Sequence, residues 1–223
     1  MAAVWTPTAN VLRAVAFATA VVLIATSCGG TSSNYVVYKP AETYFKVPKS
    51  WDVTPASDSE NDAFLRGTSW ARFFAPPGVP PEAMNDPSKS IEPMGIALIG
   101  VIEQGVYDQF GDLQLRMIIF TLAGEQQYVD PIELVNSQDD DFIRPLALEP
   151  IVQDGLRGYR VRYQIKQEDP QLPPLVWEQT KMVHDSTHTY YEFKVVCQLQ
   201  CFAKNQSDIA SIFSSLRVRR DQP

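Results

Sequence analysis

The residues of this chain best able to do chemistry are its 3 cysteines and 2 histidines. Cys197 and Cys201 stand four positions apart near the C-terminus. Four residues of extended strand span about 13 Å, whereas a disulfide needs Cα atoms about 4.4 to 6.8 Å apart. A bridge between them therefore requires a turn. The alternative is half of a zinc site, but two further ligands at zinc-binding spacing are missing nearby. We predict a Cys197–Cys201 disulfide, a bond that persists outside the cytosol.

His184 and His188 are the only histidines, and they flank the short segment "DST". On a helix this spacing would present both rings to a metal ion, but the glutamate of a metalloprotease motif is absent between them. The surrounding residues favour a hairpin turn instead, which leaves a cross-strand metal site as the alternative. The sequence has no Gly-x-Ser-x-Gly elbow, dinucleotide loop or phosphate loop. We predict no catalytic residue, no metal and no cofactor, with a hydrolase built on paired carboxylates as the less favoured alternative.

The third cysteine, Cys28, follows an apolar block that runs from Ala14 to about Ala25. One cation, Arg13, precedes this block, and no acidic residue occurs before the cysteine. A membrane-spanning helix needs about 18 to 20 apolar residues, and this block is shorter. The order of charge and apolar residues is that of a secretory signal.

The segment "LIATSCGG" resembles the end of a bacterial lipoprotein signal peptide with its lipobox, although Ala25 stands where that pattern prefers Leu, Val or Ile. The resemblance implies that residues 1–27 are removed and that Cys28 becomes an acylated first residue. Residues 28–34 would then be a tether and 35–223 a single domain. The expected location is the extracytoplasmic face of the cell membrane, held by the lipid anchor. The alternative is an ordinary signal peptide with a coincidental cysteine.

The charge of the chain excludes one class of partner. The whole chain carries a net charge of −7, and the mature part keeps 18 basic against 26 acidic residues, a net charge of −8. Binding to nucleic acid needs clustered Lys and Arg side chains that neutralise phosphates. We therefore predict no nucleic-acid partner.

The first two thirds of the mature chain predict short strands and one long loop. β-Branched and aromatic residues in Tyr35–Val53 indicate two or three strands with a turn before Trp51, and "TSWARFFAPP" indicates another. The apolar run Met94–Glu103 predicts a central strand covered on both faces. We expect a helix over Phe110–Leu122 and a solvated loop at Asp139–Phe142. The six prolines of Ala75–Pro93 predict a surface loop that buries little, either disordered or a lid.

The C-terminal third predicts an antiparallel meander followed by a helix. In "GYRVRYQIK" apolar and polar residues alternate, as in a strand with one buried face. The segments "LVWEQTKMVH" and "TYYEFKVVC" have similar character. Ile209, Ile212, Phe213 and Leu216 form the apolar stripe of a helix capped near Asn205 or Ser207. The fold class is therefore α+β, with a mostly antiparallel sheet flanked by helices.

The pieces "YFKVPKSWDV", "YYEFKVVCQLQCF" and "DIASIFSSLRV" resemble the PsbP-like α/β-sandwich lipoproteins of actinobacteria. The resemblance implies a non-enzymatic binding or accessory module of the cell envelope, with an envelope protein or component as partner. The alternative is a small-molecule or lipid carrier with a cleft between sheet and helices. Trp51, Trp70, Tyr107 and Trp177 either line a ligand groove or belong to the core. The loop Ala75–Pro93 and the hairpin tip Pro170–Pro174 are the segments expected to bind.

Overall fold

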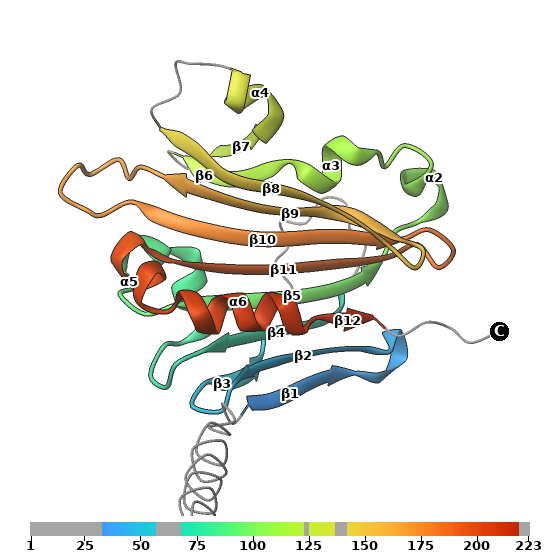
Figure 1. Cartoon of the computed structure of the whole chain (residues 1–223), viewed down its shortest axis with the longest axis horizontal. Helices are drawn as coiled ribbons and strands as arrows, with labels where there is room; N and C mark the ends of the chain where they lie inside the picture. Colours follow the sequence, from blue (N-terminus) through green and yellow to red (C-terminus); the bar gives the residue numbers. More distant parts are fainter. Residues whose placement is uncertain (1–32, 57–67, 123–124, 137–141, 219–223) are drawn as a thin grey trace, which may run out of the picture. The chain divides into compact units, whose positions relative to one another are not determined.

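Seven antiparallel strands form the main sheet of the structure, a computed structural model that describes residues 33–56, 68–122, 125–136 and 142–218 (Figure 1). The strands follow one another across the sheet in the order β3 (Asp52–Pro55), β4 (Thr68–Ala75), β5 (Met94–Val101), β11 (Thr189–Gln198), β10 (Leu175–His184), β9 (Leu156–Ile165) and β8 (Ile143–Gln153). The predicted meander is confirmed, because β9, β10 and β11 are antiparallel neighbours. The predicted central strand, β5, is buried from Met94 to Gly100.

A smaller sheet of three strands lies beside the main one. Its order is β1 (Ser33–Tyr38), β2 (Thr43–Pro48) and β12 (Arg217–Val218), and a short 3-10 helix, η1 (Lys39–Ala41), joins the first two. Alternate residues of β2 are buried, as expected of a strand with one face toward a core. The strands and the turn that the sequence predicts over Tyr35–Val53 are confirmed by β1, β2 and β3.

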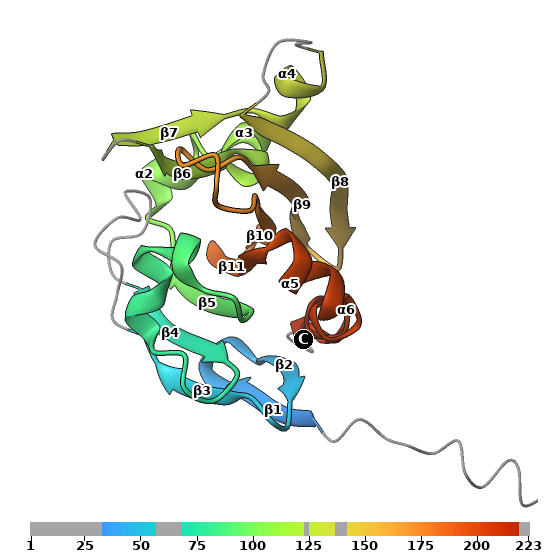
Figure 2. The same cartoon turned by 90° about the vertical axis from the view of Figure 1, so that its left-hand side faces the viewer.

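The largest core lies between one face of the main sheet and a layer made of the small sheet and two helices (Figure 2). These helices are α5 (Leu199–Lys204) and α6 (Gln206–Ser215). The predicted stripe is confirmed, since Ile209, Ile212 and Phe213 are buried in this core and Leu216 packs against it. Asn205 precedes α6, but its side chain donates to the Cys201 carbonyl at 2.9 Å rather than capping the helix.

Short elements cover the opposite face of the main sheet. They are the helices α2 (Gln104–Tyr107), α3 (Asp112–Arg116) and α4 (Pro131–Asn136), the hairpin β6 (Ile118–Leu122) and β7 (Glu125–Val129), and the 3-10 helices η2 (Pro81–Asn85) and η3 (Pro87–Lys89). Sheet residues and covering residues form four smaller apolar clusters on this side. The α+β class with a mostly antiparallel sheet flanked by helices is thus confirmed.

Two sequence predictions on this covering layer are wrong. Phe110–Leu122 is not one helix: α3 ends at Arg116, and Ile118 begins strand β6. The β-branched pair Ile118-Ile119 takes the extended form and Ile118 is fully buried against β9, so tertiary packing decides the conformation. The proline-rich segment Ala75–Pro93 does bury apolar surface, because Val79, Ala83 and Met84 pack against the sheet. The predicted loop Asp139–Phe142 lies outside the described residues except for Phe142.

The main sheet buries one carboxylate on each of its faces. Glu178 on β10 has a fully buried side chain and lies under α5 and α6 between two arginines of β9. Arg162 donates to it through Nε at 2.9 Å and Nη2 at 2.8 Å, and Arg160 donates from the other side. The guanidinium of Arg160 lies 5.1 Å from the Phe213 ring centroid, and that of Arg162 lies 5.4 Å from Phe202. The polar face of β9 is therefore half-buried and tied to the helices rather than solvated.

Glu192 on β11 is the corresponding carboxylate of the opposite face. Its register partner is Lys181, and Lys194 lies 3.2 Å from Oε1 while the Tyr190 hydroxyl donates to Oε2 at 3.1 Å. Burial alone would raise the pKa of the Glu192 carboxyl, but the charges of Lys194 and Lys181 and the two hydrogen bonds outweigh it, so this pKa lies below its usual range. Lys181 also donates to the Met117 carbonyl at 3.1 Å, which ties the sheet to the segment before β6.

Residues from Ser33 onward form one compact unit with its own core. Among the described residues, no helix is both long and apolar enough to cross a bilayer. Cys28 and the predicted signal peptide, residues 1–27, lie outside the described residues.

Candidate functional site

A groove of about 450 Å³ lies where the small sheet meets the first strands of the main sheet. Residues from three strands and the turn before β3 line it, namely Asn34, Tyr35, Val36, Val37, Trp51, Asp52, Val53, Trp70 and Arg72. Four of these are consecutive in β1, and three are consecutive over Trp51–Val53. Successive side chains of a strand point to opposite faces, so a groove lined by a consecutive run opens along the backbone edge of that strand. Both β1 and β3 are the end strands of their sheets within the described chain.

Two tryptophans are among the residues that line the groove. Trp51 is 5% exposed and stacks on Phe74 of β4 at 6.3 Å between ring centroids, so it belongs both to the core and to the groove. Trp70 is half-buried, and its ring lies 5.3 Å from that of Tyr38. Packing against these neighbours holds both rings in place.

One cation and one anion lie in the groove. The guanidinium of Arg72 is 5.0 Å from the Trp70 ring centroid, and its Nη1 donates to the Ala71 carbonyl at 2.7 Å. Asp52, at the start of β3, is exposed. The arrangement can bind a segment that brings main-chain donors and acceptors to the strand edges, apolar surface to the rings and charge to Arg72 or Asp52.

The structure divides the four aromatic residues singled out in the sequence. Trp51 and Trp70 line the groove, whereas Tyr107 and Trp177 do not. Trp177 stacks on Tyr163 at 6.4 Å in the covered face of the main sheet. Tyr107 stacks on His188 at 3.8 Å, and its hydroxyl donates to Asp185 at 2.5 Å, which raises the pKa of the tyrosine. The sequence analysis missed Tyr35, Asp52 and Arg72.

The two histidines turn to different neighbours. His188 lies against Tyr107, while His184 Nδ1 is 3.2 Å from the Ser186 hydroxyl and the ring borders Gly155. Within the residues that the structure describes, no three potential metal-ligating side chains gather at one point. This end of the sheet is held by Asp185, which accepts from Tyr107 and, at 2.8 Å, from Arg157.

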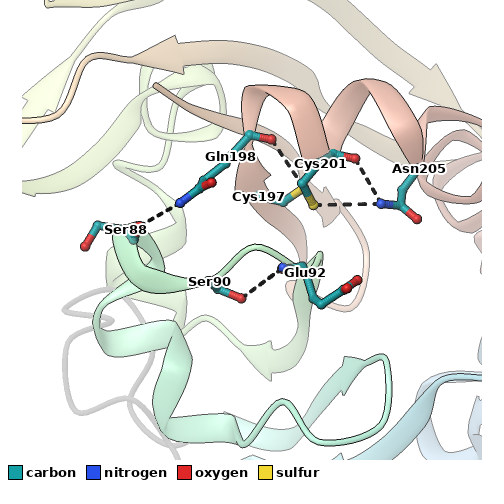
Figure 3. Close-up of a disulfide and its surroundings, with 7 residues drawn as sticks. All are labelled: Ser88, Ser90, Glu92, Cys197, Gln198, Cys201 and Asn205. Atoms are coloured by element: carbon teal, nitrogen blue, oxygen red, sulfur yellow. Dashed lines mark hydrogen bonds between the residues drawn. A yellow bond between two sulfur atoms is a disulfide. The ribbon is translucent and has the colours of Figure 1, made fainter. Parts of the chain in front are cut away.

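Cys197 and Cys201 form a disulfide with 5.8 Å between their Cα atoms, the pairing that the spacing predicts (Figure 3). The turn that the bridge requires is the junction at which β11 ends and α5 begins. Gln198, between the cysteines, donates through Nε2 to the Ser88 carbonyl at 3.0 Å. A ring this small stabilises the fold by about 2 kcal/mol in the loop-entropy description. The bridge fixes the corner, and the Gln198 hydrogen bond connects this corner to η3.

The two loops expected to bind lie away from the groove lining. The segment Ala75–Pro93 holds η2 and η3 and packs on the far face of the main sheet. The hairpin tip Pro170–Pro174 is largely exposed at the β9–β10 connection, where the Gln171 amide donates to Asp169 Oδ1 at 2.9 Å.

Comparison with known proteins yields similarity at low identity. The chain is 14% identical to cyanobacterial PsbP (CyanoP) from Synechocystis sp. PCC 6803, with a TM-score of 0.47 over 86% of this chain and 98% of that one. It is 12% identical to LpqN, a protein involved in cell envelope biogenesis of Mycobacterium tuberculosis, with a TM-score of 0.45 over 83% and 89% of the two chains. The Ran-binding protein Mog1p of Saccharomyces cerevisiae gives 10% identity and a TM-score of 0.43 over 86% and 97%. No protein-family profile and no curated protein sequence matches the chain. We carry no residue role from these proteins to this one.

Proposed function

We propose that the mature chain is a non-enzymatic binding module, anchored by acylated Cys28 on the extracytoplasmic face of the cell membrane. Its groove captures an extended polypeptide segment of an envelope protein. The resemblance of residues 14–28 to a lipoprotein signal supports the anchor. The disulfide between Cys197 and Cys201 fits an oxidising exterior.

The observation that carries the binding role is the course of the groove along two strand edges. An extended segment that pairs with such an edge gains main-chain hydrogen bonds, and its alternate side chains enter neighbouring pockets. Asn34–Val37 supply one edge and Asp52-Val53 the other. The β3 edge is only partly open to pairing, since Pro55 has no N–H to donate.

The rings and charges of the groove set the expected sequence of the bound segment. Trp51 and Trp70 favour an aromatic or aliphatic residue in the bound segment, because an aromatic ring stabilises binding most when its partner is also apolar. Arg72 lies beside Trp70 and favours a carboxylate on the next side chain that points the same way. The preferred segment is therefore extended, with one large apolar residue and one carboxylate.

A small-molecule carrier is the second candidate, and one observation favours it. The groove volume of about 450 Å³ falls within the range of ligand pockets. The carrier expected from the sequence had its cleft between sheet and helices, whereas this groove lies between two sheets. Binding of the captured peptide along the β1 and β3 edges would separate the two candidates, because a small-molecule ligand would leave these edges free.

The anchor is tested by metabolic labelling with an alkyne fatty acid. We expect label on the wild-type protein and none on Cys28→Ser, because the thioether and the free amino group of the mature cysteine are the acylation points. Label that persists in Cys28→Ser would contradict the anchor. Expression of both proteins is compared by immunoblot.

The groove is tested by a photoreactive amino acid placed at Asp52, an exposed residue of its lining, in intact cells. As the control position we choose Val152, which is 87% exposed on β8 at the other edge of the main sheet. We expect one envelope protein to crosslink at Asp52 through a single extended segment. A synthetic peptide of that segment should bind the purified protein, and Trp70→Ala should weaken its Kd at least tenfold. No crosslink at Asp52, or the same products at both positions, would overturn the proposal.

A further inference from the structure

The outer face of the small sheet, opposite its core-facing side, is apolar and basic. Cross-strand partners point to the same face, and the register pairs Tyr35 with Lys46, Val37 with Tyr44, and Tyr44 with Arg217. Tyr35 is 62% exposed and Val37 54% exposed. The intervening residues Val36, Phe45 and Val47 belong to the core, so the five other side chains lie on the outer face. Tyr44 and Lys46 are half-buried there, and Arg217 is exposed, with its Nη1 donating to the Ser214 and Leu216 carbonyls at 2.7 Å.

Contacts within this face hold its aromatic rings together. The Tyr35 and Tyr44 ring centroids are 6.5 Å apart, and the Lys46 ammonium lies 5.1 Å from the Tyr35 ring. A tyrosine beside a lysine is the composition that proteins place at a membrane interface, where the ring lies at headgroup depth and the ammonium meets phosphates.

The charge of the small sheet is opposite to that of the rest of the mature chain. Ser33–Lys49 and β12 hold the basic residues Lys39, Lys46, Lys49 and Arg217 and one acid, Glu42. The mature chain as a whole carries 18 basic against 26 acidic residues. An anionic surface therefore attracts this sheet and repels the remainder of the molecule, which orients the domain.

The length of chain before β1 limits how far this face can lie from the proposed anchor. Residues 29–32 are all that separate Cys28 from Ser33, where β1 begins. Even fully extended, the connection reaches only about 18 Å. β1 is thus the part of the fold that must stay near the bilayer once Cys28 is acylated.

We propose that Tyr35, Val37, Tyr44, Lys46 and Arg217 form a docking face for the anionic phospholipid surface of the membrane. This inference rests on the proposed function only for the position of the anchor. The docked face turns β1 toward the lipid and leaves the groove at the level of the headgroups, beside the membrane rather than far above it.

The experiment uses residues 29–223, which lack Cys28 and keep the compact unit that begins at Ser33. Sedimentation with phosphatidylglycerol vesicles should carry the protein down at low salt, and phosphatidylcholine vesicles should not. Lys46→Gln/Arg217→Gln should weaken the binding about 25-fold, since each removed charge near an anionic surface counts about fivefold. Tyr35→Ser/Tyr44→Ser should weaken the binding to phosphatidylglycerol vesicles at both low and high salt.

The matched control is Arg144→Gln/Lys204→Gln, which removes the same charge from exposed positions on β8 and α5. We expect its binding to equal that of the wild type. Equal weakening in the two charge variants, or no preference of the wild type for phosphatidylglycerol, would overturn the docking face. Residues 29–223 lack the proposed acylation site, Cys28, so these results are independent of the fatty-acid labelling. Failure of one proposal is therefore distinguishable from failure of the other.

Discussion

The two sheets of this molecule are covered differently. The main sheet is covered on one face by the small sheet with α5 and α6 and on the other by short helices, a hairpin and 3-10 helices, and it buries a charged residue on each face. The small sheet is covered on one side and leaves Tyr35 and Val37 more than half exposed on the other. Polar side chains in the main sheet therefore stabilise the fold, whereas apolar side chains on the small sheet are available for binding.

Residues that stabilise the fold and residues that are available for binding therefore lie in different sheets. The carboxylates of Glu178 and Glu192 are buried and paired, so a change there acts on folding. Tyr35 and Val37 of β1 are more than half exposed, so a change there should act on partners. The three predictions below test this separation.

The largest effect is expected at Glu178. Glu178→Ala leaves Arg160 and Arg162 without their buried carboxylate. Loss of one partner costs about 3 to 5 kcal/mol when the remaining charge is buried, and because these arginines are 24% and 27% exposed we expect a cost at the lower end of that range. The free energy of unfolding in urea measures it. Glu149→Ala on β8 is the control, since Glu149 is exposed and should cost less than about 0.5 kcal/mol. A loss at Glu178 as small as that at Glu149 would show that the covered sheet does not depend on its charges.

A smaller and pH-dependent effect is expected at Glu192. Its pKa is lower in the folded protein than in the unfolded chain, so the carboxylate stabilises the fold above its unfolded pKa of about 4.3. This contribution is lost as the pH falls through the folded pKa. Glu192→Gln should therefore cost about 2 kcal/mol at neutral pH, and the difference from wild type should shrink below about pH 4. Unfolding midpoints across this range measure it, and a constant difference would contradict the account.

The sharpest comparison uses two adjacent valines of β1. Val36 is 8% exposed in the core, and Val37 is 54% exposed on the outer face. Val36→Ala should cost about 2 kcal/mol of unfolding free energy, and Val37→Ala less than about 0.5 kcal/mol. Thermal denaturation of the two variants is sufficient to measure this, and equal losses would mean that both faces of the small sheet are structural.

Much of the main sheet could be predicted from the sequence because its signals are local. The apolar run of β5, the alternation in β9 and the stripe of α6 each follow from the period of one element. The Cys197–Cys201 spacing requires a turn, and a turn is what the junction of β11 and α5 provides. The covering layer was less predictable, since Ile118 takes the extended form only because β9 offers it a buried position.

The groove could not be predicted because its walls come from sheet ends. A sequence gives no direct sign of which strand edge stays unpaired, and that depends on how the two sheets meet. One signal was present in "YVVY", where Val36 and Val37 are both apolar. Consecutive apolar residues in a strand mean that neither face is purely solvated. Arg72 gave no comparable sign, since its contact with Trp70 follows from strand packing.

Strand β2 lies between the first and the last strands of the fold, and this arrangement sets a time order on biosynthesis. The Lys46 amide donates to the Ser215 hydroxyl at 2.8 Å across 169 positions of sequence, and β12 pairs with Thr43 and Tyr44. Contacts this distant in sequence form slowly, and a ribosome makes β2 long before α6 and β12 exist. The nascent chain therefore carries one open edge of β2, with Phe45 and Val47 lacking their helix cover, until α6 and β12 have been made. Folding of the small sheet waits for these late elements, and during that interval a chaperone has an extended, apolar segment to hold.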